Sequence, residues 1–254
     1  MPMHLSLLPS LDPAVVFLML LIFLFSGVIK GFLGIGLPTA AMAFLTLIME
    51  PTEAISLLTI PIIVTNFLQF TRSNERAQTA KKYKYFALAI MVSIFITAWN
   101  ITNFPTGFLT ATIGFAMIIF SANLLFGFSL PIGPGLRWQI GVGILSGFLG
   151  GLSSIWSPTV AMYLMARNTP KEQFIAATGF LFLAGCLPLA LGLYLSGVFT
   201  AATAIKSLMG LIIVLLGFRI GELLRGRVSQ KFFRKFVLIA FLAMGLRLIV
   251  AGIF

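Results

Sequence analysis

Acidic residues, cysteine and histidine are scarce in this chain of 254 residues, which contains 6 Asp and Glu, 1 Cys and 1 His. A single cysteine excludes an intrachain disulfide framework and a metal site built from several cysteines. A single histidine, His4, excludes a paired-histidine metal site. We therefore expect neither a metal nor another cofactor. Charged residues make up only 9% of the chain, too few to cover the surface of a soluble domain of this size.

Apolar residues make up 59% of the chain instead. A disordered chain would be polar and charged, so the composition predicts an all-α membrane protein that crosses the bilayer many times. Stretches with at most one charge divide it into about ten membrane segments, most of them near the length that crosses about 30 Å of hydrocarbon. These stretches are 13–29, 31–49, 54–71, 85–136 (divided near 100–105), 138–166 (divided by a Gly/Ser stretch), 173–205 (with a span ending near 196), 198–218 and 236–254.

The net charge of +11 could indicate nucleic-acid binding, but most basic residues form short clusters between apolar runs. That pattern is typical of cytoplasmic loops at an anionic membrane surface, so nucleic acid is not an expected partner. The basic connections are 72–84 and 219–235, with Arg137, Arg167 and Lys171 in two others, whereas 50–53, 100–106 and 196–200 contain no Lys or Arg. Alternating spans place the basic connections in the cytoplasm and both termini outside.

Three motifs recur in the same order in the two halves of the chain. GVIKGFLG at Gly27 matches GILSGFLG at Gly143, PTAAM at Pro38 matches PTVAM at Pro158, and PTE at 51–53 matches PKE at 170–172. The offset stays between 116 and 120 residues, which indicates a duplication.

The loop charges give the direction of this repeat. The basic connection at 72–84 corresponds to the uncharged 196–200, and the uncharged 100–106 corresponds to the basic 219–235. Corresponding loops therefore face opposite sides of the membrane. The sequence predicts a single membrane domain with a first repeat at 13–128 and a second, inverted repeat at 136–254, each of about five segments, a plan that recurs in secondary transporters.

Each repeat contains a glycine-rich break followed by a helix start. Gly31, Gly34 and Gly36 precede Pro38, and glycines at 147, 150 and 151 precede Pro158. Ser157 stands where a helix N-cap is expected. The helices predicted at 38–49 and 158–167 have 12 and 10 residues, or about 18 and 15 Å, roughly half the hydrocarbon thickness. Both would begin near the midplane of the membrane.

Two helix N-termini near the midplane present free N–H groups and positive dipole ends, which suit an anion. The candidate substrate-binding residues are Gly34, Gly36, Pro38, Thr39, Asn66, Gly150, Ser153, Ser154, Ser157, Pro158 and Thr159. The alternative is that the glycines only allow close helix packing, and that Asn66 forms a hydrogen bond between helices.

Three further residues could attract the anion or gate its path. Lys30 is expected to extend to the cytoplasmic face and attract an anion there. Trp156 either gates the site or fills space. Arg247 reaches the outer surface or faces a cavity. No phosphate-binding loop and no HExxH, GxSxG or Asp-rich motif is present, so we expect neither an ATP-driven pump nor an enzyme.

The segments GVIKGFLGIGLPTAAMAFL and GVGILSGFLGGLSSIWSPTVAMYL resemble the starts of the two halves of the TauE/SafE family of sulfite and organosulfonate exporters. The closing AFLAMGLRLIVAGI and the basic loop after the third segment are also similar, so the resemblance spans roughly 13–254. SSIWS stands where the family has a run of glycines. The resemblance implies export of a small sulfur-containing anion by a secondary transporter in a bacterial inner membrane.

Two other functions fit the same residues: a passive anion channel, and a transporter of another small organic anion. A membrane enzyme or assembly factor fits less well, because catalytic residues are missing and the repeat is inverted. The expected partners are the lipid bilayer and a small anionic substrate. A coupling proton or sodium ion and further copies of the chain are compatible with the sequence.

Overall fold

The computed structural model describes residues 13–73, 75–127, 133, 135–224, 227 and 229–253. This part of the chain forms ten α-helices and one short 3-10 helix, with no strand, which confirms the expected all-α class. The helices are α1 (Pro13–Leu33), α2 (Leu37–Leu45), α3 (Pro51–Thr71), α4 (Arg76–Trp99), η1 (Ile101–Asn103), α5 (Thr106–Phe126), α6 (Leu136–Ser153), α7 (Ser157–Ala166), α8 (Lys171–Leu195), α9 (Ala201–Leu224) and α10 (Gln230–Ile253). The predictions for His4 and for the repeat limits at 128 and 254 lie outside the described residues.

Seven of the described helices, α1, α3, α4, α5, α8, α9 and α10, are long and apolar enough to cross a membrane. Many of their large apolar side chains point away from the protein, among them Phe17, Val92, Phe115, Leu187 and Ile212. Exposing such a large apolar surface to water would be unfavourable, whereas contact with lipid tails is favourable. The chain is therefore a multi-pass membrane protein. Of the ten expected segments, those at α2, α6 and α7 fall short of the length or the hydropathy of a full span.

The predicted boundaries hold where the sequence contains a strong helix breaker. The division near 100–105 is confirmed, because α4 ends at Trp99 and α5 begins at Thr106, directly after Pro105. The boundary expected at Lys30 was wrong, since α1 continues through it to Leu33. Lysine is a good helix former, so one charge does not end an apolar helix. The helix expected at 38–49 has 9 residues rather than 12.

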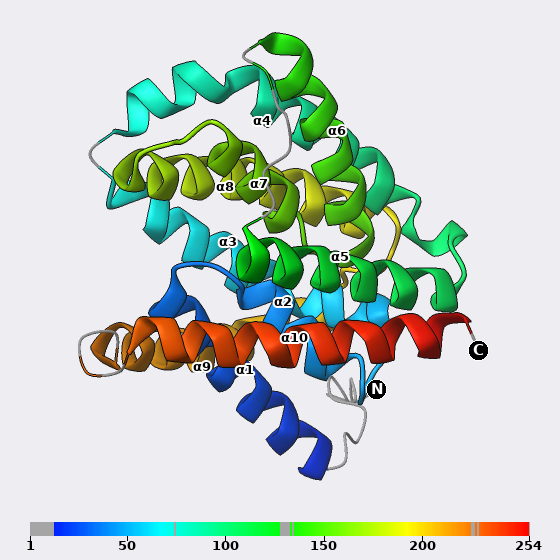
Figure 1. Cartoon of the computed structure of the whole chain (residues 1–254). Coiled ribbons are helices and arrows are strands. Elements are labelled where there is room, and N and C mark those ends of the chain that lie inside the picture. The colour runs from blue at the N-terminus through cyan, green and yellow to red at the C-terminus, as the bar shows by residue number, and fades with distance from the viewer. Residues whose placement is uncertain are drawn as a thin grey trace.

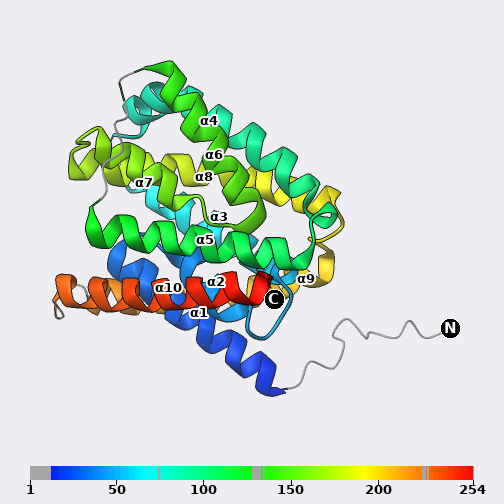
Figure 2. The ribbon, with the colours of Figure 1, turned by 45° about the vertical axis from the view of Figure 1, so that its right-hand side comes forward.

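The helices pack in three main pairs. Helix α1 packs along α9, α4 along α6, and α5 along α10. In the two views of the molecule, α4 and α6 lie on one side, while α1, α9 and α10 lie on the opposite side (Figures 1 and 2). Glycines line these contacts: a Cβ built on Gly31 would overlap the carbonyl oxygen of Phe218, and one on Gly114 would lie 2.5 Å from the carbonyl oxygen of Gly245. Close packing through small residues is typical of membrane helices.

The remaining long helices connect these pairs. Helix α3 packs on α8 and α9, and α8 also packs on α4. Ion pairs between Arg72 and Glu222 (3.1 Å) and between Glu53 and Lys206 (3.3 Å) join the two ends of α3 to the matching ends of α9. The two helices therefore run in the same direction. The end of α3, the end of α7 and the end of α9 gather on the left in Figure 1.

The short helices α2 and α7 are buried among the long ones. Helix α2 contacts α1, α3, α5 and α10, and α7 contacts α5, α6 and α8. Seven of the nine residues of α2 and seven of the ten residues of α7 are buried. Each is preceded by non-helical backbone, which membrane depth tolerates only where protein or a cavity surrounds it.

Candidate functional site

The first break lies between α1 and α2. Gly34 and Gly36 adopt left-handed conformations (φ 81° and 93°), which glycine reaches without the steric penalty of a side chain. Gly36 is the N-cap of α2, and Pro38 occupies the first turn, where a missing backbone N–H costs nothing. The backbone between α1 and α2 thus leaves the helix at two glycines, whereas Gly31, which was also expected in the break, lies inside α1.

The second break, between α6 and α7, lies further along the chain than the glycine-rich segment where it was expected. Helix α6 continues through the glycines at 147, 150 and 151 to Ser153, and the backbone leaves the helix at Ser154 (φ 58°). A Cβ built on Gly147 would lie 2.5 Å from the Cβ of Ser93 in α4, and one on Gly151 would lie 2.6 Å from the Cβ of Thr97. These two glycines therefore allow close packing of α6 on α4, the alternative considered from the sequence.

The N-terminus of α7 also differs by one residue from the prediction. The N-cap is Trp156, and Ser157, which was expected to cap the helix, is its first helical residue. Its hydroxyl makes no capping bond, because a helical Ser157 no longer stands ahead of the free N–H groups. Ser157 is 5% exposed, and its Oγ has no hydrogen-bond partner among the described residues.

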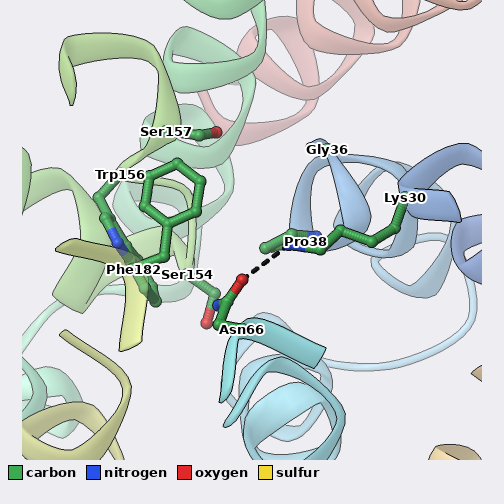
Figure 3. Close-up of a pocket in the computed structure, with 8 residues that line it drawn as sticks. All are labelled: Lys30, Gly36, Pro38, Asn66, Ser154, Trp156, Ser157 and Phe182. Carbon is green, nitrogen blue, oxygen red and sulfur yellow. Dashed lines mark hydrogen bonds between the residues drawn. The ribbon is translucent and has the colours of Figure 1, made fainter. Parts of the chain in front are cut away.

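One small pocket lies between the two breaks (Figure 3). The first half of the chain contributes four lining residues and the second half another four: Lys30, Gly36, Pro38 and Asn66, then Ser154, Trp156, Ser157 and Phe182. The space available in it is ≈ 10 Å³, room for about one water molecule. A larger ligand therefore requires the helices around the pocket to move.

Lys30 points into this pocket, so the expectation that it extends to the cytoplasmic face was wrong. Its side chain is 2% exposed, and Nζ donates a hydrogen bond of 2.7 Å to Oδ1 of Asn66. Nζ also lies 5.9 Å from the ring centroid of Phe182. The reason is tertiary: α3 and α8 bring an amide oxygen and an aromatic face to the ammonium, and these partners replace part of its hydration.

Asn66 forms the hydrogen bonds between helices that the sequence suggested. Its Oδ1 accepts from Lys30 in α1, and its Nδ2 donates to Sγ of Cys186 in α8 at 3.5 Å. Both groups of the amide are thus occupied, which holds its oxygen toward the ammonium. The hydrogen-bonding and the pocket-lining interpretations of Asn66 are therefore compatible.

Three polar groups beside the pocket are buried without a partner among the described residues: Oγ of Ser154, Nε1 of Trp156 and Oγ of Ser157. An indole N–H can only donate, and a hydroxyl can donate one hydrogen bond. Leaving such a group unpaired costs about 1–3 kcal/mol. Of the described residues, none that lines the pocket carries a carboxylate. The arrangement therefore suits a ligand that accepts hydrogen bonds and carries negative charge.

Seven of the predicted site residues do not line the pocket: Gly34, Thr39, Gly150, Ser153, Pro158, Thr159 and Arg247. The hydroxyls of Thr159 and Ser146 lie 2.6 Å apart, and that of Ser153 donates to the carbonyl of Leu149. Arg247 in α10 is exposed and lines neither of the two described pockets. Thr39 is buried in α2 with its hydroxyl unpaired among the described residues.

Phe182 is the lining residue that the sequence did not reveal. It belongs to the middle of α8, and its ring stands edge-on to that of Trp156, with centroids 6.1 Å apart. The chain contains 26 phenylalanines, and nothing in the local sequence separates this one from the others. Only the packing of α8 against the second break reveals it.

A bundle of long apolar helices around a small pocket that contains polar groups from both halves of the chain is typical of membrane transport proteins. The chain matches the sulfite exporter TauE/SafE family over residues 19–248, and it belongs to that family. This confirms the resemblance seen in the repeated motifs, and it implies membrane transport of the sulfur-anion exporter type. No curated protein and no solved structure matched the chain.

Proposed function

We propose that the protein is a secondary transporter that exports a small sulfur-containing anion, such as sulfite or an organosulfonate, across a bacterial inner membrane. The observation that carries this proposal is the pocket, which is lined by Lys30 and by three residues with unpaired buried donors, beside the N-termini of α2 and α7. The family supports a sulfur anion as the substrate.

The chemistry of such an anion matches the groups present. Sulfite and sulfonates carry three oxygens that accept hydrogen bonds, and Ser154, Trp156 and Ser157 have donors to give them. The ammonium of Lys30 supplies the opposite charge. The N-caps Gly36 and Trp156 both line the pocket, so the positive ends of two helix dipoles add to its potential. A cation would be repelled by the ammonium of Lys30 and by the positive ends of both helix dipoles.

Alternating access is the transport mechanism that we propose, with two inverted repeats at 13–128 and 136–254. The helix contacts support it, because exchanging α1–α5 with α6–α10 converts one observed pair into another: α1 with α9 becomes α6 with α4, and α3 with α9 becomes α8 with α4. The short helices α2 and α7, at 9 and 10 residues, are about 14 and 15 Å long, half of the hydrocarbon thickness. Movement of the two repeats would expose the pocket beside these helices first to one side of the membrane and then to the other.

Flux in proteoliposomes containing the purified full chain tests the proposal. We expect saturable transport of sulfite or an organosulfonate, competition among anions of that class, and weak competition by a carboxylate. Lys30→Met should strongly reduce saturable flux, because the pocket then lacks its charge, while the protein still inserts and purifies as a monodisperse species.

Two outcomes would overturn it. Flux that rises linearly with anion concentration in the unmodified protein would indicate a passive channel. Saturable uptake of a carboxylate, with none of any sulfur anion, would make the protein a transporter of another organic anion.

A further inference from the structure

Lys30 is a charged group in a membrane helix, and it has no charged partner among the described residues. Its hydrogen-bond acceptor is the neutral amide of Asn66, which cannot cancel a unit charge. The chain has six acidic residues. Asp12 lies outside the described residues, and the five glutamates, Glu50, Glu53, Glu75, Glu172 and Glu222, all lie at or near helix ends, away from the pocket.

Lys206 in α9 shows the contrasting arrangement. Its side chain is also largely buried, but Nζ lies 3.3 Å from Oε1 of Glu53. That ion pair is neutral as a whole. Removing the charges of both partners together would leave the electrostatics of the pocket unchanged, which makes the pair a matched reference for Lys30.

The surroundings of Lys30 raise the free-energy cost of keeping its ammonium charged inside the protein. The N-caps Gly36 and Trp156 border the same pocket, so the positive ends of two helix dipoles lie beside a positive side chain (Figure 3). The aromatic face of Phe182 compensates part of this charge, as does the amide. Lys30 is only 2% exposed, and the pocket has only ≈ 10 Å³ of free space, so little water is near enough to screen the charge.

We propose, resting on the function above, that the protein is an obligatory exchanger of univalent anions. With such an anion beside Lys30, the closed pocket has no net charge. Without one, closure would seal a unit positive charge into a medium of low dielectric constant. The pocket therefore closes readily only around an anion. To face the first side of the membrane again, it must close around a second univalent anion. One anion is then imported for each anion exported.

The test compares two efflux rates from the same proteoliposomes, loaded with radiolabelled sulfite at a pH where bisulfite is abundant. The outside solution contains either unlabelled bisulfite or an impermeant large anion, and potassium with valinomycin holds the membrane potential at zero. We expect efflux into bisulfite to be faster by at least about tenfold, which corresponds to about 1.4 kcal/mol between the two closed states.

Variants separate the charge of Lys30 from its packing. In Lys30→Gln the exchange rate should fall and the ratio of the two efflux rates should approach one, because closure without an anion no longer isolates a charge. Lys30→Arg should keep the ratio. The double variant Glu53→Gln/Lys206→Gln, which removes a neutral pair outside the pocket, should also keep it.

The outcomes distinguish this inference from the function on which it rests. A ratio near one in the unmodified protein, with saturable sulfite flux intact, overturns obligatory exchange and leaves the transporter standing. Absence of any saturable sulfur-anion flux overturns the proposed function itself. A ratio that stays high in Lys30→Gln sinks the assignment to Lys30. The ratio in the unmodified protein decides the matter even where Lys30→Gln fails to insert.

Discussion

Ser157 lines the pocket, although it does not have the capping role that the sequence predicted. From the sequence it was expected to cap a helix, yet its hydroxyl is unpaired among the described residues and lies beside the pocket. At an N-cap, that hydroxyl would form a hydrogen bond with a backbone N–H of the first helical turn. Because Trp156 takes the cap position, the hydroxyl remains available to a ligand.

Substitution of Ser157 should affect anion binding according to the sign of the new group. Ser157→Ala should weaken binding by about 0.5–1.5 kcal/mol, the contribution of one neutral hydrogen bond. Ser157→Asp should abolish it, since the new carboxylate lines the same pocket as the ammonium of Lys30 and competes with the anion for it.

Isothermal titration of sulfite into the detergent-solubilised variants measures both effects. Ser196→Ala, at the C-cap of α8 and outside the pocket, is the control and should bind as the unmodified protein does. Unchanged affinity in Ser157→Asp would remove Ser157 from the binding site.

At the scale of the element, α6 combines a packing role with support of the pocket. Glycines at 143, 147 and 151 face α4. Gly150 faces another way: a Cβ built on it would lie 2.9 Å from Cε3 and 3.0 Å from the Cβ of Trp156. Gly150 thus does not line the pocket, but the space that it leaves is occupied by a residue that does.

Gly150→Val should therefore reduce transport sharply, because the new side chain displaces Trp156 and with it the indole donor. Gly141→Ala is the matched control in the same helix, since a Cβ there meets no atom within 4 Å, and it should leave transport unchanged. Flux per reconstituted molecule gives the effect, and the yield of monodisperse protein shows insertion. Normal flux in Gly150→Val would assign this glycine to packing alone.

At the scale of the whole molecule, the proposed orientation rests on which helix ends carry basic residues. Arg72 at the end of α3 pairs with Glu222 near the end of α9, and Arg234 in α10 donates a hydrogen bond to the carbonyl of Leu124 in α5. These contacts join ends that the loop charges assign to one side. Because cytoplasmic loops are rich in Lys and Arg, that side is the proposed cytoplasmic face.

Single cysteines test this orientation in a Cys186→Ser background. Ala77, Ser229 and Thr200 are exposed and lie in or beside three different connections. Cysteines at 77 and 229 should react with an impermeant thiol reagent only from the cytoplasmic side, and one at 200 only from outside. The Cys186→Ser background without an added cysteine should not react. Labelling of positions 77 and 200 from the same side would contradict the inverted repeats.

The sequence by itself determined the features that depend on local chemistry. Apolar length specifies helices that span a bilayer, and prolines mark the starts of α2, α3 and α7. The left-handed conformations at positions 34 and 36 favour glycine, which has no Cβ. The non-helical positions before α2 and α7 lie within a few residues of the repeated motifs. All the residues that line the pocket except Phe182 were already candidates from the sequence.

Tertiary structure alone decided where Lys30 points, which glycines serve packing and that Phe182 lines the pocket. Each of these depends on neighbours supplied by distant segments. The amide of Asn66 in α3, for example, bonds to Lys30 in α1 and to Cys186 in α8, which is 120 residues away, so both bonds form only when the three helices meet. A lysine in an apolar helix extends to the surface or turns inward according to the partner that it finds. No local pattern encodes that partner, because it forms only when the helices pack.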